Sequence, residues 1–198
     1  MSLPAAKVAS AELLRVSGLH AFYGESHILH GVDFAVGTGE LVTLLGRNGS
    51  GRTTTLKSIV GLVDKRTGSI VVSGRETIAM PSHRIVRLGL GYCPEERGIF
   101  ASLTAEENLT LLPVVGPGGM ALDEITEGLA PVIVQALGRA VRALKERGYT
   151  IILVEQNFRF VAPLADRHFL VERGRIVDAL ERGDLEARME SLQRFLGV

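Results

Sequence analysis

The segment LLGRNGSGRTT at residues 44–54 decides the fold that the sequence predicts. It fits the phosphate-loop pattern G-x-x-x-x-G-K-[ST], except that Arg52 stands where the pattern has lysine. The apolar run ELVTLL at residues 40–45 indicates a buried strand, and residues 53–60 indicate a helix. Strand, glycine loop and helix thus follow one another in the order that a phosphate-binding loop requires.

A loop of this kind binds phosphate mainly through its backbone. Glycines let the chain curl so that N–H groups point inward, and the following helix adds the positive end of its dipole. The hydroxyl of Thr53 is the expected Mg²⁺ ligand. The alternatives are a glycine-rich turn without a ligand and a dinucleotide loop, which is disfavoured because the glycines follow G-x-x-G-x-G. The expected nucleotide-binding residues of the loop are Gly46, Asn48, Gly49, Ser50, Gly51, Arg52, Thr53 and Thr54.

The composition narrows the class of protein. The chain has 198 residues, 46% of them hydrophobic, which suits one domain with a proper core. Lys plus Arg and Asp plus Glu both number 22, so no overall charge favours nucleic acid as the main partner. The single cysteine, Cys93, excludes an internal disulfide, and no apolar run is long enough to span a bilayer. We therefore expect a protein of a reducing compartment that lies, at most, beside a membrane.

The rest of the chain alternates between strands and helices. Short strands are expected at residues 13–16, 31–36, 69–72, 91–93, 150–154, 168–172 and 175–179. Helices are expected at residues 82–88, 104–112, 131–147 and 185–196. This order predicts an α/β fold, with a mainly parallel sheet flanked by helices and an antiparallel β portion near the N-terminus. Thr104 and Glu107 form a capping-box pattern, and residues 113–119 are a linker rich in breakers.

The acidic pair Asp123 and Glu124 follows the apolar residues 120–122. In a magnesium-dependent nucleoside triphosphatase, a residue such as Asp123 binds Mg²⁺ and one such as Glu124 polarises the attacking water. The alternative is a pair that only caps a helix. The glycine loop upstream favours the catalytic interpretation.

Three further segments make the chain resemble the ATPases of ABC transporters: DEITEGLAP at residues 123–131, TIILVEQN at 150–157 and PEERGIF at 94–100. In combination they are most similar to the ATP-binding subunits of branched-chain amino-acid importers, over nearly the whole chain. The resemblance implies a P-loop nucleoside triphosphatase fold in one domain at residues 1–198, with ATP and Mg²⁺ as ligands. It also implies permease subunits and a second ATP-binding subunit as partners. The chain would then be cytoplasmic and peripheral on the inner face of the cell membrane, coupling ATP binding and hydrolysis to transport.

The resemblance assigns roles to three more residues. Tyr23 takes the position of the aromatic residue that stacks on adenine, with a core aromatic as the alternative. Glu95 takes the position of the Q-loop, which usually has glutamine, and could reach Mg²⁺ or its water. Gln156 takes the switch position, where most ABC ATPases have histidine; it can donate a hydrogen bond but cannot be protonated. Its alternative role is a polar cap on the strand.

The chain departs from the family pattern at three places. Arg52 carries a wide planar guanidinium where the loop usually encloses a compact ammonium. Ile125 replaces the proline that usually follows the glutamate, which should have a modest effect. Only seven residues separate Leu112 from Met120, so the helical subdomain and the LSGGQ-type signature of the family have no counterpart.

These departures affect the expected activity. In the family, two subunits enclose ATP between the glycine loop of one and the signature of the other. We therefore expect weak ATP binding and little or no hydrolysis by this chain alone. The alternatives are a non-hydrolysing nucleotide-binding remnant with a structural or regulatory role and a P-loop small-molecule kinase, which the absence of an arginine-rich lid segment disfavours.

Overall fold

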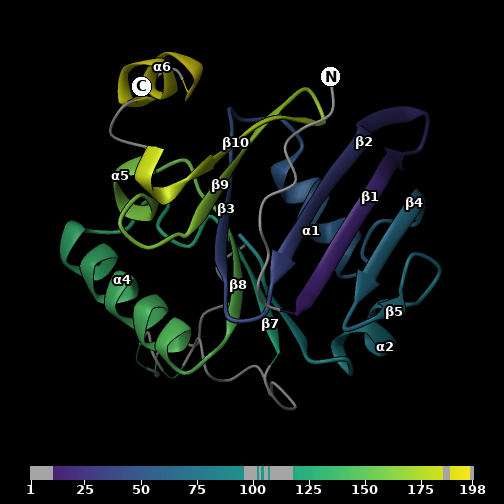
Figure 1. Cartoon of the computed structure of the whole chain (residues 1–198), viewed down its shortest axis with the longest axis horizontal. Helices are drawn as coiled ribbons and strands as arrows, with labels where there is room; N and C mark the ends of the chain where they lie inside the picture. Colours follow the sequence, from purple (N-terminus) through teal and green to yellow (C-terminus); the bar gives the residue numbers. More distant parts are fainter. Residues whose placement is uncertain are drawn as a thin grey trace.

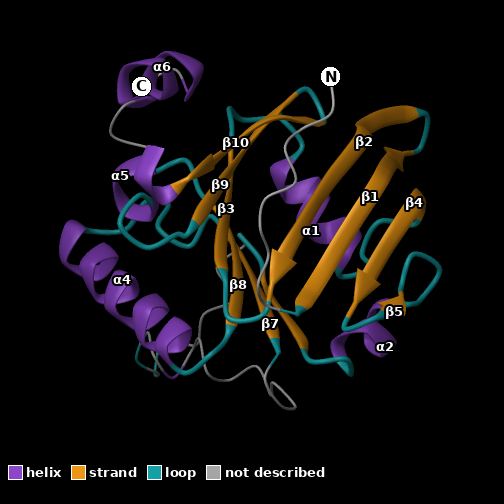
Figure 2. Ribbon diagram, in the orientation of Figure 1, coloured by secondary structure: helices purple, strands orange, loops and turns teal. Residues whose placement is uncertain are grey.

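The fold has two β-sheets with a helix between them, and these elements position the candidate site residues (Figure 1). The computed structural model describes residues 11–95, 102, 104, 107, 118–184 and 188–196. One sheet has four strands and the other has six. Figure 2 shows helix α1 (Arg52–Ile59) between the sheets, and helix α4 (Pro131–Glu146) on the opposite side of the six-stranded sheet.

The four-stranded sheet is antiparallel, in the order β2-β1-β4-β5. Its first two strands are much longer than the short strands expected from the sequence. They continue past a register shift between Val16 and Leu19, where Gly18 takes a φ of 53° that glycine adopts readily. The predicted antiparallel β portion is confirmed. Its strands are β1 (Glu12–Tyr23), β2 (Ser26–Gly37), β4 (Lys65–Val72) and β5 (Arg75–Glu76).

The six-stranded sheet has the order β10-β9-β3-β8-β7-β6 and is parallel except for β10. Its central strands are short apolar runs, as expected for strands that are buried on both faces. Because these strands are parallel, their carboxyl ends meet at one edge, where ligands bind in open α/β sheets. The strands are β3 (Leu41–Leu45), β6 (Leu90–Cys93), β7 (Gly119–Asp123), β8 (Thr150–Val154), β9 (Arg167–Glu172) and β10 (Arg175–Glu181).

Alternate residues of the central strands build two separate cores. Val42 and Leu44 of β3 join the core that contains α1 and the four-stranded sheet. Leu41 and Leu45 face the other way and pack in the core that contains α4. All four are fully buried, so the register of β3 is fixed by burial on both faces. The glycine loop that follows β3 therefore starts from a rigid point.

The helices largely follow the sequence pattern. The helix α4 begins at Pro131, because proline suits the first turn of a helix. Leu137, Val141 and Leu144 of its expected apolar stripe are buried, whereas Ile133 is exposed. The helix α6 (Met189–Leu196) lies within the range expected for the last helix, of which residues 185–187 lie outside the described residues, and a short 3₁₀ turn is found at Arg182–Asp184. The backbone N–H of Glu107 donates to Thr104 Oγ1 at 3.2 Å, which confirms the capping-box contact. Most of the helix expected at residues 104–112, and residues 113–117 of the expected linker, lie outside the described residues, and the last linker residue, Gly119, belongs to β7. The other helices are α2 (Ser82–Val86), α5 (Phe158–Val161) and α6 (Met189–Leu196).

Candidate functional site

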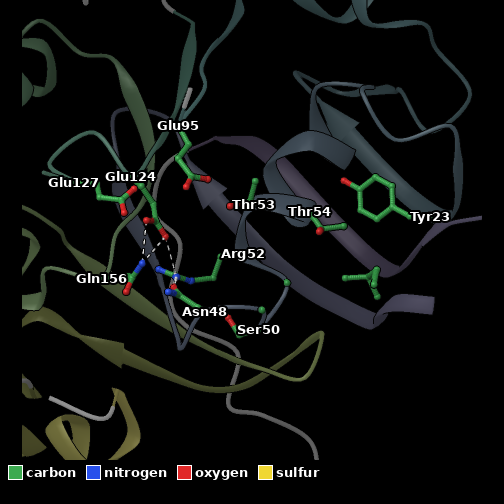
Figure 3. Close-up of a pocket in the computed structure, with 13 residues that line it drawn as sticks. Tyr23, Asn48, Ser50, Arg52, Thr53, Thr54, Glu95, Glu124, Glu127 and Gln156 are labelled. Atoms are coloured by element: carbon green, nitrogen blue, oxygen red, sulfur yellow. Dashed lines mark hydrogen bonds and ion pairs between the residues drawn. The ribbon is translucent and has the colours of Figure 1, made fainter. Parts of the chain in front are cut away.

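The glycine loop runs from the end of β3 to the start of α1 beside a cavity of about 420 Å³ (Figure 3). Gly49 and Gly51 have φ angles of 75° and 104°, which explains the glycines at these two positions. Gly51 also caps α1, so backbone N–H groups at the helix start lie beside the cavity. Of the loop residues predicted from the sequence, the cavity is lined by Asn48, Gly49, Ser50, Gly51, Arg52, Thr53 and Thr54.

Gly46 serves the loop in a different way, because it does not line the cavity. A Cβ atom at this position would lie 2.3 Å from the backbone oxygen of Val171 and 2.6 Å from Ser50 Oγ. Where the chain leaves β3, Gly46 therefore lies so close to the backbone of β9 that only glycine fits at this position. The oxygen Ser50 Oγ is buried there without a hydrogen-bond partner among the described residues.

Asp123 ends β7 and is fully buried beside the loop. Its Oδ1 accepts a hydrogen bond from Thr53 Oγ1 at 3.1 Å, and its Oδ2 accepts one from the Tyr92 hydroxyl at 3.3 Å. Burial raises the pKa of Asp123 to about 6, although both hydrogen bonds act to lower it. Hydroxyl and carboxylate oxygens are the ligands that Mg²⁺ prefers, so this donor pair fits the ion. The contact from Tyr92 was not expected, since nothing in the sequence pairs these two residues.

Arg52, Glu124 and Gln156 form one hydrogen-bonded group (Figure 3). Arg52 Nη2 donates to Glu124 Oε1 at 3.0 Å and to Asn48 Oδ1 at 3.2 Å. Gln156 Nε2 lies 3.1 Å and 3.0 Å from the two carboxylate oxygens of Glu124. Gln156 is thus not merely a cap on β8, because it contacts the residue expected to polarise water.

The ion pair in this group is buried, with 4% of the Arg52 side chain and 8% of the Glu124 side chain exposed. Burial lowers the pKa of Arg52, and the carboxylates of Glu124, Asp123 and Glu155 oppose that shift. The second terminal nitrogen, Arg52 Nη1, is buried and has no hydrogen-bond partner among the described residues. The loop therefore accommodates a guanidinium, and Glu124 and Asn48 take one side of its fork.

Glu124 also has an unusual backbone, which β8 holds in place. Its φ is 45°, and its N–H donates to the backbone oxygen of Val154 at 2.9 Å. Glu155, the residue directly after β8, is buried and accepts two hydrogen bonds of 2.8 Å, from the N–H and the hydroxyl of Thr126. The pKa of Glu155 is raised because the carboxylate is buried, although the hydrogen bonds from Thr126 act to lower it. Sequence reasoning missed this contact, although a glutamate directly after a buried strand was a signal.

Tyr23 lies at the other end of the cavity from Gln156 (Figure 3). It ends β1 and is 47% exposed, so the alternative of a core aromatic is wrong. Ile28 lines the cavity as well and was not expected. Near the loop, carboxylate oxygens of Glu95, Glu124 and Glu127 lie within 4.8 Å of one another. The cavity thus has an aromatic end and a strongly acidic end, with the glycine loop between them.

Comparison with known proteins decides the family. Residues 29–188 match the family model described as ABC transporter. This chain belongs to the ABC transporter family. Within the family it is an ATP-binding subunit, and the fold expected from the resemblance is confirmed.

Individual relatives differ in the transport process that their names describe. The high-affinity branched-chain amino acid transport ATP-binding protein BraG of Pseudomonas aeruginosa is 31% identical, over 83% of this chain and 91% of that protein. The lipopolysaccharide export system ATP-binding protein LptB of Acidithiobacillus ferridurans is 28% identical, over 85% of this chain and 90% of that protein. A crystal structure of a nucleotide-free ATP-binding cassette from an ABC transporter matches with a TM-score of 0.77 at 17% identity. It covers 95% of this chain and 99% of the other, and it shows the common fold.

Proposed function

We propose that this ABC transporter ATP-binding subunit binds ATP with Mg²⁺ in the cavity beside the glycine loop. The observation that carries the proposal is the convergence of Tyr23, the loop, Glu95, Glu124 and Gln156 on one cavity, although they come from distant parts of the chain. Tyr23 offers a flat face for adenine at one end. The loop N–H groups and Arg52 offer donors to the phosphates at the other.

Mg²⁺ would be held by Thr53 and Asp123, and bound Mg²⁺ supplies positive charge against the phosphate oxygens. Glu124 would orient and polarise the attacking water, with Gln156 fixing the direction of its carboxylate. Glu95 reaches the same side of the cavity as Glu124. Each of these roles uses a side chain at the carboxyl edge of the central sheet.

The transported substrate that we favour is a branched-chain or related amino acid. The support is the likeness to the Pseudomonas aeruginosa protein at 31% identity, against 28% for the lipopolysaccharide export protein. The partners would be permease subunits and a second ATP-binding subunit, with the chain peripheral on the cytoplasmic face of the membrane. Among the described residues, no helix is both long and apolar enough to cross a membrane.

The second candidate function is a nucleotide-binding subunit that hydrolyses little or no ATP by itself. Two observations favour it: Glu124 is engaged by Arg52, and the sequence between Leu112 and Met120 is too short for the signature segment. The alignment with the Pseudomonas aeruginosa protein runs over 212 residues but takes in 83% of this 198-residue chain. That difference supports a single domain that is shortened around residues 113–119.

A titration with a fluorescent ATP analogue, with and without Mg²⁺, tests the proposal. Thr53→Val should abolish the gain in affinity that Mg²⁺ gives, and the matched control Thr67→Val, on the exposed face of β4, should retain it. Equal Mg²⁺ dependence in both variants would refute the assigned metal ligand. Rapid Mg²⁺-dependent phosphate release from the purified chain, lost in Glu124→Gln, would instead refute the low intrinsic activity.

A further inference from the structure

Among the described residues that line the cavity, one positively charged side chain is available to a phosphate. Of the described residues that line the cavity, Arg52 is the single cation, whereas Glu95, Glu124 and Glu127 are carboxylates. An entering polyphosphate meets this acidic wall and needs the guanidinium to offset the repulsion. Two anions therefore attract Arg52: the entering phosphate and the Glu124 carboxylate, which already accepts a hydrogen bond from it.

The guanidinium is placed to exchange between these two anions. Its Nη2 atom is shared by Glu124 and Asn48, at 3.0 Å and 3.2 Å. Its Nη1 atom is buried, has no acceptor among the described residues, and belongs to a side chain that lines the cavity. A buried donor without a partner is costly, so Nη1 offers an entering phosphate its first charge-assisted hydrogen bond. A bidentate contact with both terminal nitrogens also needs Nη2, which must then leave Glu124.

Glu124 has a second holder that does not depend on Arg52. Gln156 Nε2 contacts both carboxylate oxygens, and the backbone N–H of Glu124 is bound to Val154. If the guanidinium turns to a phosphate, Glu124 stays at the same place in the cavity. The lone pair of Oε1 that accepts from Arg52 can then accept a hydrogen bond from water, while Gln156 still donates to the carboxylate.

We propose that nucleotide phosphate and Glu124 compete for Arg52, so that Arg52 blocks the Glu124 carboxylate until a nucleotide draws the guanidinium away. This rests on the proposed function, because it requires that nucleotide binds at the glycine loop. It makes the arginine at the lysine position a regulatory contact: it lowers nucleotide affinity and ties the availability of Glu124 to occupancy of the cavity.

The test measures ADP binding by calorimetry, so that hydrolysis plays no part. Glu124→Gln keeps the size of the side chain but removes the charge that holds Arg52, and it should tighten ADP binding about tenfold, or about 1.4 kcal/mol. The matched comparison is Glu95→Gln, which removes the same charge from the same cavity at a residue that is not among the described hydrogen-bond acceptors of Arg52, and its gain in affinity should be at least about threefold smaller than that of Glu124→Gln.

A double-mutant cycle then isolates the competition. In an Arg52→Lys background, Glu124→Gln should gain no more than Glu95→Gln, because lysine lacks the guanidinium nitrogen Nη2 that bridges Glu124 and Asn48. Arg52→Lys alone should also bind ADP more tightly than the parent chain. Urea unfolding of every variant shows that each is folded under the binding conditions.

Two other results overturn the inference in distinguishable ways. If the parent chain binds ADP and Glu124→Gln gains no more than Glu95→Gln, or gains equally in the Arg52→Lys background, the competition is refuted and nucleotide binding stands. If neither the parent nor any variant binds ADP, the proposed function is refuted, and the competition is refuted with it.

Discussion

Replacing Glu155 with alanine tests how the structure fixes the acidic end of the cavity. The Glu155 carboxylate accepts the N–H and the hydroxyl of Thr126, each at 2.8 Å, and both residues are buried. Thr126 lies two residues after Glu124, whose φ of 45° is unfavourable for a side chain with a Cβ. We infer that this pair of hydrogen bonds keeps the turn after β7 in the shape that directs Glu124 into the cavity.

The magnitude follows from the groups that lose their partner. Alanine leaves two buried donors of Thr126 unsatisfied, and each such donor costs about 1–3 kcal/mol. The loss is partly offset, because burial raises the pKa of Glu155 and the ionised carboxylate is itself costly to bury. We expect Glu155→Ala to lower the free energy of unfolding by roughly 2–4 kcal/mol.

Glu155→Gln is the matched control. An amide oxygen can accept from the Thr126 N–H, and the amide nitrogen can donate to the Thr126 hydroxyl, so both contacts survive in altered form. We expect this variant to lose less than about 1 kcal/mol. Thr126→Val removes one of the two donors, and its loss in free energy of unfolding should lie between those of Glu155→Gln and Glu155→Ala.

Urea unfolding followed by circular dichroism measures these differences as shifts of the midpoint at constant slope. A cycle of Glu155→Ala, Thr126→Val and the double variant gives the coupling between the two side chains. Equal stability of Glu155→Ala and the parent chain would refute the reasoning, and so would an equal loss in Glu155→Gln and Glu155→Ala.

Two further changes probe the loop and a buried histidine. Gly46→Ala places a Cβ 2.3 Å from a backbone oxygen of β9, so it should lower the free energy of unfolding in urea by about 1–3 kcal/mol. The control Gly183→Ala, with open space around it, should lower it little. Similar losses in the two variants would contradict the close approach of Gly46 to β9. His168 is fully buried, and burial lowers its pKa to about 4, whereas its unfolded value is 6.5. The unfolded chain therefore binds a proton first, and stability should fall by roughly 3 kcal/mol as pH drops from about 6.5 to about 4. His168→Gln should reduce the change in the free energy of unfolding between about pH 6.5 and pH 4. An equal pH dependence in the variant and the parent chain would show that His168 is not the cause.

Those parts of the site that depend on local sequence could be predicted. The glycine loop is set by a strand, three glycines and a helix within about 20 residues, each of which has a local pattern. Asp123 could be placed because it ends an apolar run, and strand ends of a parallel sheet share one edge. Gathering Tyr23 into the same cavity required the resemblance to a family, since nothing local links β1 to that edge.

Contacts that depend on register between distant strands could not be predicted. The bond from Tyr92 to Asp123 joins β6 to β7, and the bonds from Thr126 to Glu155 join the turn after β7 to the end of β8. The sequence shows the residue types in both cases but not the alignment of the strands. A one-residue slip of β6 against β7, for example, would turn Tyr92 to the opposite face of the sheet, away from Asp123.

Arg52 shows why residue type alone misjudges such a site. The width of the guanidinium suggests that it fits poorly in a loop suited to lysine, and on that basis its main effect would be steric. In the structure the side chain is 4% exposed, and its Nη2 atom is shared by Asn48 in the glycine loop and Glu124 directly after β7, two residues far apart in the sequence. In the proposed competition, its effect on nucleotide affinity is set by which anion holds it. On that proposal we expect a smaller cation at position 52 to change nucleotide affinity by weakening the contact with Glu124, even where the loop has room for either side chain.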